Sequence, residues 1–160
     1  MVGKVWYLGL FVFLLLVFFF DIRNRRVPNL LLGIAILMQL FFFCFGFISE
    51  EWLHPLVFPE VRSALLGFLG LFVLFFPLWI KNVAGAGDVK FIAVLGLLLG
   101  WQPAAWVVLL SGFLTFPHAL LQVLQVRRDG PHKKIERRGV PYAGYIALTA
   151  IIWLIWKLLE

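Results

Sequence analysis

The sequence predicts an all-α protein that crosses a membrane several times. Of its 160 residues, 63% are hydrophobic and the mean hydropathy is +1.01, which is too apolar for an ordinary soluble domain. Apolar runs near the length of a membrane span alternate with short segments rich in charge, glycine or proline. We predict about six transmembrane helices in one domain, residues 1–160, because no internal repeat or low-complexity linker divides the chain.

The first predicted helix covers residues 5–20, and at about 24 Å it is short for a span unless its flanks extend it. Positive charges follow this run, beginning at Arg23, and no small-residue cleavage site precedes them. We therefore interpret it as a retained helix and not as a secretory signal. Pro28 disfavours helix at Val27 and suits a first helical turn, so we predict a loop over 21–28 and a second helix over 30–48.

The third predicted helix covers residues 63–80, after a loop without basic bias. Its Gly67 and Gly70 suit close helix approach, although glycine is equally ordinary in a lipid-facing helix. A glycine-rich break over 81–87 precedes a brief fourth apolar segment, residues 88–100. Gly96 and Gly100 within it have a spacing that we interpret as a packing feature at best.

Residues 101–103 are predicted to form an uncharged turn, followed by a fifth helix over 104–126 that is interrupted at Pro117 and His118. We interpret His118 as the partner of a backbone carbonyl freed by the proline, and leave it out of the candidate site. A hydrophilic loop covers 127–139, and a sixth helix covers 140–159.

Basic residues concentrate after the odd-numbered helices. Eleven lie there, whereas only Arg62 lies after the even-numbered ones. The eleven are Arg23, Arg25, Arg26, Lys81, Lys90, Arg127, Arg128, Lys133, Lys134, Arg137 and Arg138. By the positive-inside rule the odd loops face the cytoplasm and both termini lie outside. The net charge of +6 is thus explained by membrane topology and contact with lipid, and we predict no nucleic-acid binding.

Two aspartates lie at the predicted membrane boundary. Asp88 stands in Gly85-Ala86-Gly87-Asp88, where an apolar segment restarts, and Asp21 ends the first apolar run. A carboxylate in such a place is costly and usually signals function. The structural alternative for Asp88 is a helix N-cap, but a cap needs neither glycine, whereas glycine permits positive φ and close backbone approach. The predicted topology puts both carboxylates on the cytoplasmic face.

Two carboxylates in one apolar pocket suit hydrolysis of a peptide bond by an activated water. Both cannot ionise cheaply, so one acts as general base while the other donates a proton. The residues leave open which aspartate holds the proton. Ser49, Ser63 and Ser111 have no base nearby in sequence, although pairing across the fold stays open.

We expect no metal and no cofactor. The single cysteine, Cys44, lies within an apolar run and supplies neither a disulfide nor a paired metal-binding motif.

Three stretches resemble the prepilin peptidases, which are membrane aspartic peptidases of the GxGD type. That family carries one aspartate ahead of a Val/Ile-Pro-Asn segment, as Asp21 stands ahead of Val27-Pro28-Asn29. It carries a second in Gly-x-Gly-Asp-x-Lys, which residues 85–90 match. Gly139-Val140-Pro141-Tyr142 is similar to a third family feature, at the entry to the last helix. A lone glycine motif is weak, but three matches in order are strong.

The resemblance implies an enzyme of the cell membrane that cuts the short basic leader from prepilins or pseudopilins at the cytoplasmic face. Larger bacterial members carry a region with paired cysteines and also methylate the new N-terminus. Because Asp21 lies only twenty residues in and there is one cysteine, we predict a peptidase without methyltransferase activity. It is similar in this to the short members that process Flp-type pilins or archaeal preflagellins.

Other residues are assigned to the substrate or to the pocket walls. Gly85 and Gly87 leave the backbone bare, so that an extended substrate segment can lie beside Asp88. Lys90 either orients an acidic substrate group or snorkels to the interface. The expected wall residues are Pro28, Asn29, Pro141 and Tyr142.

Two alternatives stay open. Intramembrane proteases of the presenilin and signal-peptide-peptidase kind pair Tyr-Asp in one helix with Gly-x-Gly-Asp in the next, whereas here Phe20 precedes Asp21 and two spans separate the aspartates. A small ion- or proton-coupled transporter or channel subunit also uses acids in the membrane, but near mid-bilayer. The oligomeric state is not predicted.

Overall fold

The computed structural model describes residues 2–48, 59–129 and 141–159, and these form six helices. They are α1 (Val2–Asn24), α2 (Asn29–Ile48), α3 (Val61–Ile80), α4 (Ala86–Leu99), α5 (Trp101–Asp129) and α6 (Tyr142–Leu159). The described residues contain no strand, so the predicted all-α class is confirmed.

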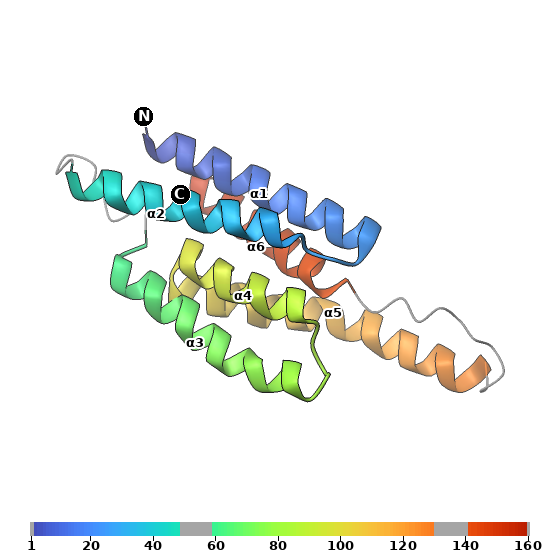
Figure 1. The fold of residues 1–160 in the computed structure, drawn as a ribbon. Helices are drawn as coiled ribbons and strands as arrows, with labels where there is room; N and C mark the ends of the chain where they lie inside the picture. Colours follow the sequence, from blue (N-terminus) through green and yellow to red (C-terminus); the bar gives the residue numbers. More distant parts are fainter. Residues whose placement is uncertain (1, 49–58, 130–140, 160) are drawn as a thin grey trace.

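The helices run roughly along one direction, and α4 lies at the centre of the bundle (Figure 1). It packs against α2, α3, α5 and α6, while α1 packs against α6. Every residue from 91 to 99 is buried, which explains why α4 is apolar all round. The last turn of α1 and the first turns of α4 and α6 lie at the same end of the bundle (Figure 1).

Within the described residues, four helices are long and apolar enough to cross a membrane, namely α1, α3, α5 and α6. Their outer faces expose many large apolar side chains, such as Leu66, Val73 and Phe113. So much exposed apolar surface is unfavourable in water but is what lipid contact requires. The predicted polytopic membrane protein is confirmed in this coarse form.

Backbones of α3 and α4 meet at two glycines. A Cβ built on Gly67 would lie 2.5 Å from the carbonyl oxygen of Gly96, so no side chain fits at this crossing. Small residues allow this kind of close approach between membrane helices. Of the two alternatives left open for these glycines, Gly67 makes the close approach, whereas a Cβ on Gly70 meets no described atom within 4 Å.

The first helix is longer than predicted, because α1 runs to Asn24 and Asp21 lies in its last turn instead of in a loop. Arg23 in that turn suits the negative end of the helix dipole. The helix ends where Arg25 adopts φ 53° and its N–H donates to the carbonyl of Asp21 at 2.9 Å. The helix α2 starts directly after Pro28, as predicted.

The predicted turn at 101–103 is wrong, because α5 begins at Trp101. Gly100 reverses the chain by itself, with φ 82°, a conformation that glycine adopts at little cost. The N–H of Trp101 donates to Ser63 Oγ at 3.3 Å, and Pro103 lies in the first turn, where a missing N–H is tolerated.

The predicted interruption at Pro117 is also wrong, since α5 continues through it to Asp129. Membrane helices tolerate proline in this way because neighbouring groups satisfy the freed backbone. His118 Nδ1 lies 2.8 Å from the hydroxyl of Tyr145 on α6, a contact that was not predicted. Its predicted bond to a backbone carbonyl stays a prediction. The other four predicted helices agree with the structure to within two residues at each end.

Candidate active site

The last turn of α1 places Asp21 inside the bundle, where only 4% of the residue is exposed. Its Oδ2 accepts a hydrogen bond of 2.7 Å from the N–H of Gly144 in the first turn of α6. A Cβ on Gly144 would lie 3.2 Å from the same oxygen, so glycine leaves room for the carboxylate to approach. The buried carboxylate therefore has a backbone hydrogen-bond donor.

The first turn of α4 places Asp88 three residues after the N-cap, Gly85. Its carboxylate accepts hydrogen bonds from the N–H of Gly85 and from that of Ala143 on α6. The bond to Gly85 is one half of a capping box. Asp88 thus helps to start the helix, as the N-cap alternative proposed, but the N-cap residue itself is Gly85. The bond to Ala143 comes from another helix and is not part of local capping.

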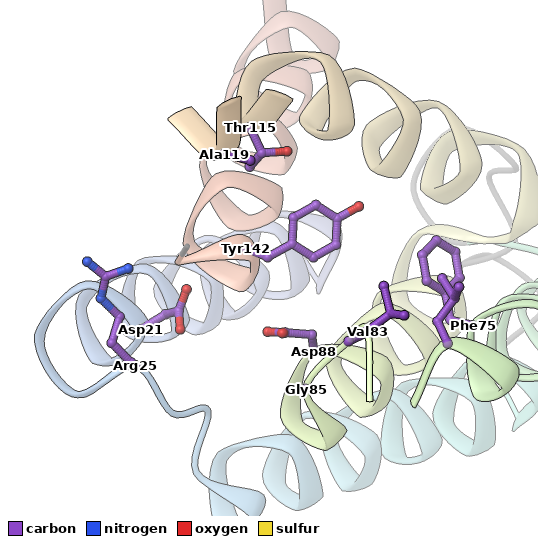
Figure 2. Close-up of a pocket in the computed structure, with 11 residues that line it drawn as sticks. Asp21, Arg25, Phe75, Val83, Gly85, Asp88, Thr115, Ala119 and Tyr142 are labelled. Atoms are coloured by element: carbon purple, nitrogen blue, oxygen red, sulfur yellow. The ribbon is translucent and has the colours of Figure 1, made fainter. Parts of the chain in front are cut away.

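The two carboxylates face one cavity of about 580 Å³ (Figure 2). Its wall is formed by residues of α1, α3, α4, α5 and α6, together with the segment that precedes α4. The described lining residues are Asp21, Arg25, Phe75, Leu78, Val83, Ala84, Gly85, Asp88, Thr115, Ala119 and Tyr142. Most of the wall is apolar, and the polar groups gather on the side where α1, α4 and α6 meet (Figure 2).

Electrostatic interaction links the aspartates. Asp88 lies close enough to Asp21 for their negative charges to repel, and Arg25 acts on Asp21 with the opposite sign. Carboxylates that share such a pocket do not ionise independently, because the first charge opposes the second. The charges of the two carboxylates are therefore coupled.

Of the predicted pocket-shaping residues, Gly85 and Tyr142 line the cavity. Pro28, Asn29, Gly87, Lys90 and Pro141 are not among its described lining residues. Gly139 and Val140, from the third matched stretch, lie outside the described residues.

Lys90, Gly85 and Gly87 make contacts that were not predicted from the sequence. Lys90 Nζ donates to Asn29 Oδ1 at 3.3 Å and joins α4 to the start of α2. Gly85 has φ −69°, so a positive φ does not explain the glycine. Close approach explains it, because a Cβ there would lie 2.9 Å from Asp88 Oδ2. At Gly87 a Cβ would only touch Val27, at 3.8 Å from its nitrogen.

Sequence reasoning missed the polar face of α5. Ser111, Thr115 and His118 are spaced by four and three residues, so they share one side of an otherwise apolar helix. Thr115 lines the cavity, Ser111 is hydrogen bonded to Tyr142, and His118 to Tyr145. Their spacing was visible in the sequence and could have indicated a face directed at another polar element.

Among the parts of the chain that the structure describes, no group of three or more His, Cys, Asp or Glu side chains comes together.

This arrangement defines a multi-pass membrane protein with two convergent carboxylates. The model of the type IV leader peptidase family matches residues 8–120, a stretch that contains Asp21 and Asp88. The chain belongs to this family, and the predicted resemblance is confirmed.

Two curated relatives carry the name prepilin leader peptidase/N-methyltransferase, one from Aeromonas hydrophila and one from Aeromonas salmonicida strain A449. Each is 30% identical over 99 residues, which cover 60% of this chain and 32% of the relative. The match thus spans about a third of these relatives. No solved structure matches the chain significantly.

Proposed function

We propose that the protein is a membrane aspartic endopeptidase that removes the short basic leader from prepilin-like proteins. The observation that carries the proposal is the convergence of Asp21 and Asp88, from α1 and α4, on one cavity. Membership of the family and the names of the relatives support the same reaction. The protein partner is then a prepilin or pseudopilin.

Hydrolysis proceeds through a water bound between the carboxylates. The ionised aspartate takes a proton from the water as it attacks the scissile carbonyl carbon, and the protonated one donates to the carbonyl oxygen. As the C–N bond breaks, the proton gained from water passes to the leaving amine. A hydroxyl of the tetrahedral intermediate returns its proton to the other aspartate as the new carboxyl group forms, so the pair again holds one proton. No covalent intermediate with the protein forms.

The cavity suits a chain that is apolar on one side of the cut and basic on the other. Phe75, Leu78 and Val83 give one wall an apolar surface. The carboxylates on the opposite side attract a basic leader. Gly85, which is exposed at the edge, leaves backbone free to pair with an extended segment.

We also propose that residues 1–160 act as one peptidase domain in the cell membrane, with the site at the cytoplasmic face. The distribution of Lys and Arg supports this orientation. Labelling checks it: in a Cys44→Ser background, Val83→Cys should react with a membrane-impermeant maleimide only from the cytoplasmic side. Val83 is 72% exposed, so its replacement is accessible to the reagent.

Cleavage of a prepilin co-reconstituted in liposomes tests the reaction. Wild type should cut after the leader glycine, whereas Asp21→Asn and Asp88→Asn should not, because an amide cannot exchange the proton. Asp129→Asn is the matched control, as it makes the same change at the end of α5, and it should cut normally.

Two results would contradict the proposal: a wild type that does not cut, or an Asp21 or Asp88 variant that cuts at the normal rate. Proton flux through the same liposomes would then test the transporter alternative. The predicted lack of methyltransferase activity stays a prediction, which S-adenosylmethionine added to the same assay checks.

A further inference from the structure

The first turn of α6 donates successive backbone amides to the two aspartates. Ala143 N–H bonds to Asp88, and Gly144 N–H bonds to Asp21. The first amides of a helix have no partner within it. The N–H of Tyr145, the next residue, donates to the carbonyl of Pro141 at 3.2 Å, as in an ordinary helix. The amides of Ala143 and Gly144 just before it are both used by carboxylates.

Such an arrangement fixes the spacing of the carboxylates. Neighbouring Cα atoms are about 3.8 Å apart, so groups bound to neighbouring amides are held close together. The positive end of the α6 dipole also favours the negative charge of the pair. A shift of this turn moves both hydrogen-bond donors at once, and with them both aspartates.

Side chains fasten this turn to α5. The hydroxyl of Tyr142 bonds to Ser111, whose own hydroxyl donates to the carbonyl of Val108, so the tyrosine is the donor. One turn further, the hydroxyl of Tyr145 shares a hydrogen bond of 2.8 Å with His118 Nδ1. The two tyrosines lie three residues apart and therefore face α5 together.

We propose that Pro141, Tyr142, Ala143 and Gly144 form a clamp, the α6 clamp, that sets the geometry of the aspartate pair. His118 and Tyr145 are positioning residues: neither is among the described residues of the cavity wall, and they act by holding the clamp against α5. The catalytic part of this inference rests on the proposed function, whereas the structural part does not.

Hydrogen exchange tests the clamp without any substrate. Measured residue by residue in detergent, the amides of Ala143 and Gly144 should exchange slowly in the wild type although they open a helix. Asp88→Ala should release Ala143, and Asp21→Ala should release Gly144. Tyr145→Phe, which removes one oxygen atom, should raise exchange at both amides by about fivefold, the effect of one lost hydrogen bond.

The matched control for exchange is Gln39→Leu. It removes another buried hydrogen bond between helices, that from Trp6 Nε1 to Gln39 Oε1 at 2.8 Å, between α1 and α2. It should leave both α6 amides protected. Fast exchange at Ala143 and Gly144 in the wild type, or no change in Tyr145→Phe, would overturn the clamp.

Kinetics test the positioning role. Tyr145→Phe and His118→Phe should each lower kcat about tenfold and leave KM unchanged, because misplaced catalytic groups slow the chemical step. The double variant should be no slower than His118→Phe alone, since the bond to Tyr145 is already lost in that variant. Gln39→Leu should keep the wild-type kcat.

A kcat that falls equally in Gln39→Leu and Tyr145→Phe would reduce the pair to a structural role and overturn the positioning assignment. An inactive wild type would instead contradict the proposed function, and the exchange experiment would still decide whether the clamp exists.

Discussion

The two ends of α4 are built in opposite ways. At its C-terminal end, Gly96 lies against Gly67 with no space for a side chain, and a Cβ on Gly100 would come 2.7 Å from Ser63 Oγ. At its N-terminal end, Asp88 lies at a cavity of about 580 Å³ and is held by hydrogen bonds. One end is fixed by shape, and the other by polar contacts around an open space.

The packed end of α4 therefore contributes mainly to stability, whereas the cavity end carries the groups of the proposed reaction. A contact between backbones fails when a single carbon is added, because nothing flexible can move aside. The cavity end has space for small changes of side-chain volume, but its activity should depend on the charge of Asp88 and on the hydrogen bonds that hold it. Substitutions at the two ends should therefore affect different observables.

The largest effect is expected at the polar end, on activity alone. Asp88→Asn should lower the rate of prepilin cleavage by about 10³-fold, within the range for loss of a general acid or base. The thermal midpoint should fall only slightly, because asparagine has nearly the same size and keeps one acceptor oxygen beside the N–H groups of Gly85 and Ala143. Rates and melting curves in the same detergent measure both. A variant that unfolds would mean that the charge also holds α4 in place.

The next effect is expected at the tightly packed end, on stability alone. Gly67→Ala should destabilise the protein by about 1–3 kcal/mol, the usual range for overpacking, since its Cβ would meet Gly96 at 2.5 Å. Gly70→Ala is the control, and it should be neutral or slightly stabilising, because its Cβ meets no described atom within 4 Å. Denaturant titration measures the free energy of unfolding. Equal effects in the two variants would contradict the described crossing of α3 and α4.

A smaller effect separates the two glycines before Asp88. Gly85→Ala should lower kcat by about fivefold, as the added carbon 2.9 Å from Asp88 Oδ2 turns the carboxylate and breaks one hydrogen bond. Gly87→Ala is the matched comparison. Its Cβ makes only an ordinary contact with Val27, so kcat should be nearly unchanged. The opposite order would show that substrate contact, and not the capping bond, explains the glycines.

The smallest effect is expected at Lys90. Lys90→Met removes an exposed hydrogen bond to Asn29 and should change the free energy of unfolding by no more than about 0.5 kcal/mol. Cleavage of a prepilin should proceed at the wild-type kcat and KM. A clear rise in KM would instead support the predicted contact with an acidic group of the substrate.

Much of the fold was predictable because its signals are local. The length of each apolar run, Pro28 before α2 and the glycine-rich break before α4 are all features of short segments. The errors came where one residue decided the outcome, as when Gly100 alone reversed the chain. Another error came at Pro117, because membrane helices accept a proline that would interrupt most helices in water.

Hydropathy was enough to predict the class of the protein, and Asp21 and Asp88 stood out because carboxylates at apolar boundaries are rare. The groups that hold them could be seen only once the helices were packed together. The groups that bind Asp21 and Asp88 are the amides of Gly144 and Ala143, and every residue but proline carries an amide. No side-chain pattern marks which amide will meet a carboxylate, because that depends on how α6 packs against α1, α4 and α5.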